Sequence, residues 1–85
     1  MPPSYVYILL SRSIPKTYVG QSDHPDERLS RHNAGKVKST RAFVPGERIY
    51  LECCKSHADA LAREKWFKSR AGRKTIVKLL RKRQP

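Results

Sequence analysis

Glu64 is the residue whose surroundings most strongly suggest chemistry. Between Arg63 and Arg83 the sequence contains ten lysines and arginines, and Glu64 is the only acid among them. In a helix, its neighbours three and four positions away would be Ala60, Leu61, Phe67 and Lys68, and the first three of these are apolar. A carboxylate beside an apolar stripe is costly unless it is paired or binds a cation. Two interpretations stay open: a structural ion pair with a nearby arginine, and a metal-binding or catalytic group.

Two tyrosines in neighbouring strands form a second candidate set. If the turn between the strands is symmetric and places Leu10 opposite Thr17, then Tyr7 lies opposite Gly20 and becomes a diagonal neighbour of Tyr18. In this register we expect Gly20 to leave the space in front of Tyr7 unobstructed. A slip of one residue would separate the two tyrosines. Tyrosines in strands often serve only packing, so the pair alone is not specific.

Arg28 and His32 are four residues apart, and they would share one face of a helix predicted over residues 24–34. Asp23 is the predicted N-cap, with a proline in the first turn, and Gly35 is the predicted stop. On a solvated helix an arginine and a histidine at these positions would ordinarily be surface or capping residues. Whether they form a functional site depends on which side chains of the other strands and helices lie next to them.

The elements that would position these residues follow from hydrophobic pattern and turn signals. Strands are predicted over residues 5–10, 17–20 and 48–54, the first of them central because both its faces are apolar. In the third strand, alternation puts Ile49, Leu51 and Cys53 on one face and Arg48, Tyr50 and Glu52 on the other.

Two further helices complete the prediction. Ser56 opens one that runs to about Ser69, and a third is predicted over residues 73–83 after a break at Gly72. In the third helix, an apolar stripe is expected from Ile76, Val77 and Leu80. The resulting fold class is α+β: a small three-stranded antiparallel sheet flanked by helices, in the order β-β-α-β-α-α.

Charge points to the kind of partner. The 85 residues contain 19 basic and 7 acidic side chains, a formal charge of +12, which favours a polyanion such as nucleic acid. We expect a single domain over residues 1–85, with its core at about 5–80 and a basic tail at 81–85. No apolar run is long enough for a membrane helix, so no membrane is expected. Adjacent Cys53 and Cys54 favour two free thiols in a reducing cytoplasm.

Taken in order, these motifs resemble the GIY-YIG nuclease family. The two name-giving motifs correspond to residues 5–7 (Tyr-Val-Tyr) and 18–20 (Tyr-Val-Gly), followed by the helix with Arg28 and His32 and the helix with Glu64. The chain is most similar to small stand-alone bacterial members, which also tend to carry stretches like residues 38–41 and 72–74. It departs from the pattern at Tyr5, where the family has glycine.

The resemblance implies a metal-dependent endonuclease that hydrolyses DNA phosphodiester bonds by in-line attack of water. It makes Tyr7, Tyr18, Arg28, His32 and Glu64 the catalytic set. Arg28 would clamp the phosphate and Glu64 would hold one divalent metal, most simply Mg²⁺ with Mn²⁺ as an alternative. Tyr7 is the preferred base, and Tyr18 and His32 are a possible relay, although the sequence does not decide which tyrosine takes the proton.

Substrate binding would fall to further residues that contact phosphates without reading bases. These are Gly20, Lys36, Lys38, Arg41, Lys68, Arg70, Arg73, Lys74 and Lys78. Lys68 could instead simply pair with Glu64. We expect a monomer that binds DNA largely independently of sequence, with RNA not excluded. Two rival hypotheses are a non-catalytic nucleic-acid-binding module on the same scaffold and a small basic ribosome-associated protein.

Overall fold

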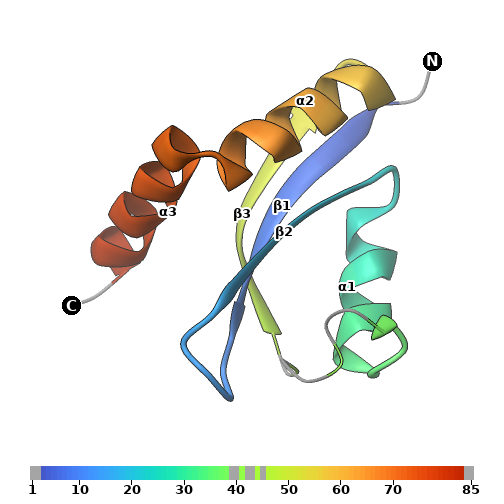
Figure 1. Cartoon of the computed structure of the whole chain (residues 1–85). Helices are drawn as coiled ribbons and strands as arrows, with labels where there is room; N and C mark the ends of the chain where they lie inside the picture. The colour runs from blue at the N-terminus through green and yellow to red at the C-terminus, as the bar shows by residue number, and fades with distance from the viewer. Residues whose placement is uncertain (1–2, 39–40, 42–43, 45, 84–85) are drawn as a thin grey trace.

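Three strands and three helices follow one another as β-β-α-β-α-α in the computed structural model, which describes residues 3–38, 41, 44 and 46–83. The elements are β1 (Ser4–Ser11), β2 (Thr17–Ser22), α1 (Pro25–Asn33), β3 (Gly46–Cys54), α2 (His57–Lys68) and α3 (Arg70–Arg83). The sheet order is β2-β1-β3 with both pairs antiparallel, so the first strand is central as predicted (Figure 1). The predicted fold class is confirmed.

The register of β1 against β2 is also the predicted one. Leu10 pairs with Thr17, Leu9 with Tyr18, and Tyr7 with Gly20. Because side chains alternate along a strand, Tyr7 and Tyr18 therefore share one face of the sheet. This face lies opposite the one that carries the hydrophobic core.

The core fills the space between the other sheet face and the helix pair α2–α3. Val6 and Ile8 of β1 are fully buried there, against Ala60 and Phe67 of α2 and Ile76 of α3. Burial of a large aliphatic or aromatic side chain contributes about 1.5–3 kcal/mol, so these residues anchor both helices to the sheet. No helix in the described ranges is long and apolar enough to cross a membrane.

In β3 the strict alternation expected from the sequence does not hold throughout. Ile8 pairs with Tyr50 but Leu9 pairs with Arg48, an irregularity that leaves Ile49 as an extra residue between the two pairs. Consequently Ile49 and Tyr50 both pack against the core, while Leu51 is 42% exposed.

The ends of α1 match the prediction at one end only. The helix begins at Pro25 with His24 as its N-cap, and no side chain caps it. The predicted cap, Asp23, instead accepts a hydrogen bond from the hydroxyl of Ser4, so that prediction was wrong. Gly35 does end the helix: its φ of +75° suits glycine, and its N–H donates to the carbonyl of His32 at 3.0 Å.

Between α2 and α3 the break lies at Ser69 rather than at the predicted Gly72. Ser69 is extended, and α3 begins immediately after it, three residues earlier than predicted. Gly72 lies inside α3, where a Cβ atom would come within 2.1 Å of the Trp66 carbonyl oxygen. The glycine therefore allows α2 and α3 to pack closely. From sequence alone, a glycine with this role cannot be told from one that ends a helix.

The apolar stripe of α3 also differs from the prediction. Ile76 is buried and Leu80 packs against the core as expected, but Val77 is 45% exposed and Leu79 takes its place. The helix ends at Arg83, as the predicted helix over 73–83 does, so residues 81–83 of the expected basic tail belong to α3. Residues 84 and 85 of that predicted tail lie outside the described part of the chain.

Candidate active site

The ring of Tyr7 lies directly over Gly20 of the neighbouring edge strand. A Cβ atom at position 20 would be 2.5 Å from the Tyr7 hydroxyl oxygen and 2.7 Å from Cζ. The side chain of Tyr7 is only 3% exposed, and its hydroxyl reaches across β2. The expected open space in front of Tyr7 is thus occupied by its own ring, and glycine at position 20 makes that placement possible.

Three rings follow one another along this face. The centroids of Tyr7 and Tyr18 are 6.5 Å apart, and those of Tyr18 and His32 are also 6.5 Å apart with planes 28° from parallel. The structure therefore brings together both predicted tyrosines and the predicted histidine, with half-buried Tyr18 in the middle.

Arg28 reaches Tyr7 from α1. Burial raises the pKa of the Tyr7 hydroxyl above 10.0, a hydrogen bond with Arg28 acts to lower the pKa, and the nearby Tyr18 and Glu64 act to raise it. Burial is the largest of these causes, so the Arg28 cation does not by itself acidify the phenol. Side chains from β2, α1 and α2 thus all act on the hydroxyl of Tyr7 in β1.

His32 is buried rather than on the surface, with 3% exposure. Burial lowers the pKa of His32 below 6.5, and the positive charge of Arg28 lowers it further, so the imidazole is neutral at pH 7. Its Nε2 atom has no hydrogen-bond partner among the described residues. A Cβ atom at Gly46 would lie 2.8 Å from this nitrogen, so β3 closes one side of the histidine.

Glu64 has no arginine partner within the described ranges. Its side chain is 19% exposed, and its Oε1 lies 3.6 Å from Nζ of Lys68, a loose contact across one helical turn. The adjacent Arg63 is engaged elsewhere, at 3.1 Å from Glu52. The structural ion pair between Glu64 and an arginine is therefore not observed, whereas the pairing of Lys68 with Glu64 is.

A lone carboxylate suits some metals better than others. The described residues contain no group of three or more His, Cys, Asp and Glu side chains that could hold a metal ion. Structural zinc sites need about four protein ligands, but Mg²⁺ commonly takes one or two carboxylates and keeps several waters. The residues around Glu64 therefore fit a hydrated, hard divalent cation.

The predicted phosphate-binding residues fall into two groups. Lys68 and Arg73 line a groove beside the site, together with Thr17, Tyr18, Val19, Phe67 and Ile76. Arg70, Lys74 and Lys78 are exposed on α3, whereas Lys36 and Lys38 follow α1 on the surface. Arg41 donates its Nε hydrogen to the Gly35 carbonyl at 2.9 Å and so binds the end of α1. Residues 39 and 40, within the expected 38–41 stretch, lie outside the described residues.

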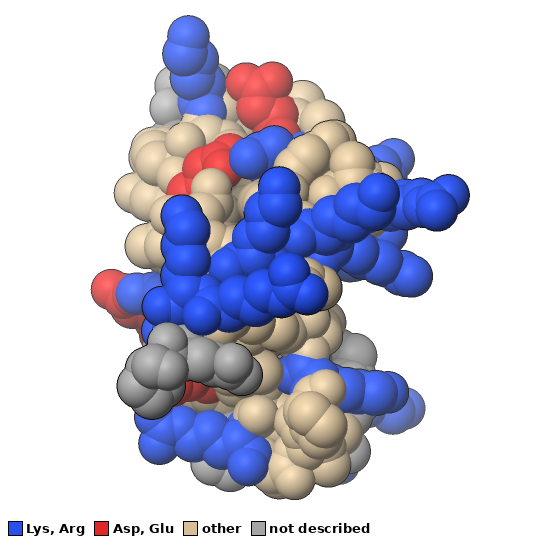
Figure 2. All heavy atoms as spheres, turned by 90° about the vertical axis from the view of Figure 1, so that its left-hand side faces the viewer, with Lys and Arg blue, Asp and Glu red and all other residues tan. Residues whose placement is uncertain are grey.

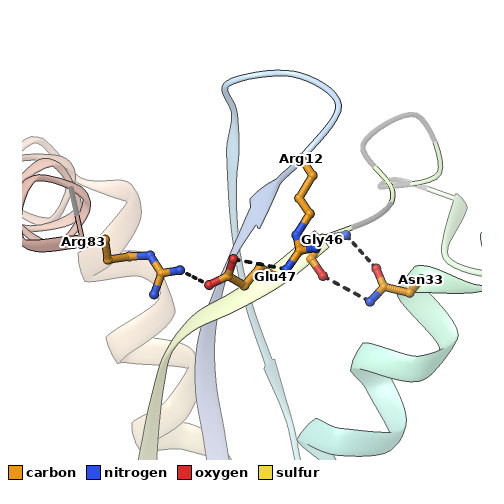
Figure 3. Close-up of polar contacts among 5 residues, drawn as sticks. All are labelled: Arg12, Asn33, Gly46, Glu47 and Arg83. Atoms are coloured by element: carbon orange, nitrogen blue, oxygen red, sulfur yellow. Dashed lines mark hydrogen bonds and ion pairs between the residues drawn. The ribbon is translucent and has the colours of Figure 1, made fainter. Parts of the chain in front are cut away.

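Asn33 and Gly46 form a contact that the sequence did not predict. The Asn33 amide donates to the Gly46 carbonyl at 3.1 Å, and the Gly46 N–H donates to the Asn33 side-chain oxygen at 2.7 Å (Figure 3). The pair ties the end of α1, which carries His32, to the start of β3. Its partners are 13 residues apart with a loop between them, so no local pattern in the sequence could have found it.

Next to this contact, Glu47 joins two more segments. It pairs with Arg12, which follows β1, at 3.5 Å and with Arg83 at the end of α3 (Figure 3). The start of β3 thereby connects α1, the β1–β2 hairpin and α3. These contacts hold the frame in which the catalytic candidates lie.

Comparisons with known proteins identify the family of this chain. A UPF0213 protein of Streptococcus agalactiae is 35% identical over 79 residues, covering 89% of both chains. UPF0213 proteins of Bacillus licheniformis and Streptococcus pyogenes are 37% and 38% identical; they align with 75% and 82% of this chain and with 66% and 76% of their own lengths. No solved structure gives a significant match. The family model for the GIY-YIG catalytic domain matches residues 3–76, so the chain belongs to the GIY-YIG nuclease family.

Proposed function

We propose that this protein is a metal-dependent endonuclease that hydrolyses DNA phosphodiester bonds by in-line attack of water. The observation that carries the proposal is the buried Tyr7 hydroxyl over Gly20, which hydrogen-bonds with Arg28 and whose pKa the carboxylate of Glu64 acts to raise. A module that only bound nucleic acid would have no use for a carboxylate whose ion pair among the described residues is a loose one with Lys68.

Arg28 is proposed to bind the scissile phosphate. Its planar guanidinium carries a permanent charge and can donate two parallel hydrogen bonds to phosphate oxygens. As negative charge accumulates on these oxygens, the arginine stabilises the transition state more than the ground state. The half-buried position of Arg28 beside Tyr7 restricts the orientations of the guanidinium before substrate binds.

Tyr7 is proposed to accept a proton from the attacking water. Its pKa is raised by burial, so the phenol must be acidified by a cation that arrives with the substrate or must pass its proton onward. Tyr18 and His32 extend from Tyr7 as a row of rings, and the Nε2 atom of His32 has no hydrogen-bond partner among the described residues. This row is the proposed route for the proton.

Glu64 is proposed to hold the metal, Mg²⁺ or Mn²⁺. When bound, the cation would supply Lewis-acid stabilisation of the leaving oxygen. The role of this chain is to provide one carboxylate. Its existing contact with Lys68 is loose and would cost little to give up. Lys68 lies on the same face of α2 as Glu64, is exposed, and is proposed to bind a neighbouring phosphate.

DNA without strong sequence preference is the proposed substrate. With a charge of +12, counterion release should dominate binding, and affinity should fall steeply with salt. RNA is the alternative backbone with the same chemistry. Cleavage of both nucleic acids by the purified protein would compare the two directly.

The test is cleavage of labelled duplex, nicked, branched and single-stranded DNA in Mg²⁺, Mn²⁺ or EDTA. Replacement of Tyr7 by phenylalanine should slow cleavage about 100-fold, as expected for loss of a general base. Tyr50→Phe is the matched control, because Tyr50 also has a raised pKa but lies in a separate network on β3. No metal-dependent cleavage by the wild-type protein, or equal rates for both variants and the wild type, would overturn the proposal.

A further inference from the structure

One face of α3 carries a row of cations that nothing in the described structure neutralises. Its exposed basic residues without a carboxylate partner in that part of the chain are Arg70, Arg73, Lys74, Lys78, Arg81 and Lys82. Figure 2 shows lysine and arginine side chains gathered over the side of the molecule on which α3 lies. The seventh basic residue of the helix, Arg83, is the one that pairs, with Glu47.

This arrangement is unfavourable for the helix itself. Arg70, Lys74, Lys78 and Lys82 follow one another at intervals of four, so each repels the next across one turn. The first turn of α3 has no acid and contains arginines, which oppose the helix dipole. By contrast, α1 and α2 both have acids in their first turns. The dipole favours Arg81 and Lys82 in the last turn, but the rest of the face repels itself and has no partner in the described structure, which points to an external polyanion.

The cationic row is continuous with the candidate active site on one side only. Lys68 and Arg73 line the groove that also contains Thr17 and Tyr18, at the start of β2. Beyond the other end of β2, the chain carries the acids Asp23, Asp26 and Glu27, which line a separate surface depression. Asp26 is paired with Arg48 at 2.8 Å in that depression, so the unpaired cations that would attract a phosphate backbone lie along α3.

We infer that α3 is a phosphate track: the row of α3 cations, with Lys68, binds the phosphodiester backbone of nucleic acid as it leaves the cleavage site past Thr17. The inference deepens the proposed function and rests on it for the position of the cut. The 14 residues of α3 span ~21 Å, which matches the rise of about six base pairs of duplex DNA. An anionic lipid surface is disfavoured, since Ile76, Leu79 and Leu80 of α3 pack on the core and leave Val77 as the single exposed large apolar side chain of the helix.

The test is binding of a labelled 24-base-pair duplex, and of one of its strands, in EDTA over a range of salt. Lys78→Glu and Lys55→Glu are a matched pair, because each lowers the net charge by two and each replaces an exposed lysine. Lys55 lies in the turn between β3 and α2, away from α3. We expect Lys78→Glu to weaken binding about tenfold and to reduce the salt slope by about one to two units, and Lys55→Glu to change affinity less than twofold.

Thermal melting guards against a folding artefact. The glutamate introduced by Lys78→Glu lies between Lys74 and Lys82, so the melting temperature without DNA should hold or rise. Equal losses of affinity in the two variants would overturn the inference, because net charge alone would then explain binding. Binding of α3 to vesicles with anionic lipid but not to DNA would also overturn it. Because this binding assay contains no metal, its result does not depend on cleavage. If DNA binds along α3 here but is not cut in the separate cleavage assay with Mg²⁺ or Mn²⁺, the nuclease proposal is refuted and the phosphate track stands.

Discussion

Arg63 and Glu64 are consecutive residues of α2 with opposite surroundings. Arg63 points toward β3, where its Nε lies 3.1 Å from both carboxylate oxygens of Glu52. Glu64 acts electrostatically on Tyr7, and its ion pair within the described part of the chain is the contact with Lys68 at 3.6 Å. One flank of the helix is thus closed by a completed network, and the other is left open.

The closed flank satisfies each of its polar groups internally. Tyr50 donates its hydroxyl hydrogen to Glu52 at 2.5 Å, and the Arg63 guanidinium lies 4.4 Å from the centre of the Trp66 ring and 4.7 Å from that of Phe67. Such a network positions α2 on the sheet and needs no ligand. The open flank has charges of both signs close together without comparable pairing, which is typical of a site that binds something else.

The largest expected effect separates the two carboxylates. Glu64→Gln should abolish Mg²⁺-dependent cleavage and leave the metal-free melting temperature unchanged or higher, because the loose surface pair it removes contributes at most about 0.5 kcal/mol. Glu52→Gln should lower stability by about 1–2 kcal/mol, since it deprives Arg63 of its charged partner. Cleavage per folded molecule should survive in the Glu52 variant.

Melting curves with and without Mg²⁺ provide the measurement. The cation should raise the melting temperature of the wild type and of the Glu52 variant, but not that of the Glu64 variant, because only a bound ligand shifts the folding equilibrium. A Glu64 variant that is clearly destabilised yet still cuts DNA would show that Glu64 belongs to the closed flank.

The next effect compares the two arginines. Arg28→Ala should slow cleavage on the order of 100-fold through the loss of transition-state stabilisation, while stability changes by only about 0.5 kcal/mol. Arg63→Ala should do the reverse, because it leaves Glu52 without its cation and removes contacts to Trp66 and Phe67. Rates and urea denaturation of both variants would test this. Near wild-type cleavage by Arg28→Ala would remove this arginine from the mechanism.

A smaller effect on rate is expected from two glycines. Gly20→Ala places a methyl group 2.5 Å from the Tyr7 hydroxyl oxygen, so the ring must move, and cleavage should fall about tenfold. Gly72→Ala meets backbone atoms of α2, at 2.1 Å from the Trp66 carbonyl oxygen, and should instead lower stability by about 1–3 kcal/mol. A rate for Gly20→Ala equal to that of the wild type would mean that the Tyr7 position is not critical.

The sequence predicted features that depend on local periodicity and pairing. The register that unites Tyr7 with Tyr18 follows from the hairpin, and the Ser56 cap follows from local hydrogen bonding. Other features depend on contacts between distant segments. Asp23 accepts a hydrogen bond from Ser4 instead of capping α1, and Gly72 lies inside a helix because the backbone at Trp66 packs closely against it. Burial of His32 likewise depends on Gly46, 14 positions along the chain, and no helical pattern reveals that.

The smallest expected effect is the pH dependence of stability that arises from His32. This histidine lies between Tyr18 of β2 and Gly46 of β3. Because burial and Arg28 lower its folded pKa below 6.5, the unfolded chain binds more protons as the pH falls below 6.5, and the imidazole destabilises the fold there. Tyr18 stacks on the ring, and the positive charge of Arg28 acts in the same direction as burial, so protonation of His32 is costly.

Between pH 7.5 and 5.5 the melting temperature of the wild type should therefore fall a few degrees more than that of His32→Phe over the same range. Exposed His57, at the start of α2, supplies the control, and His57→Gln should keep the wild-type pH response. Melting curves of the three proteins at half-unit pH steps measure the difference. If His32→Phe loses as many degrees as the wild type, His32 does not couple folding to pH, and its place in the row of rings would have to be explained by packing alone.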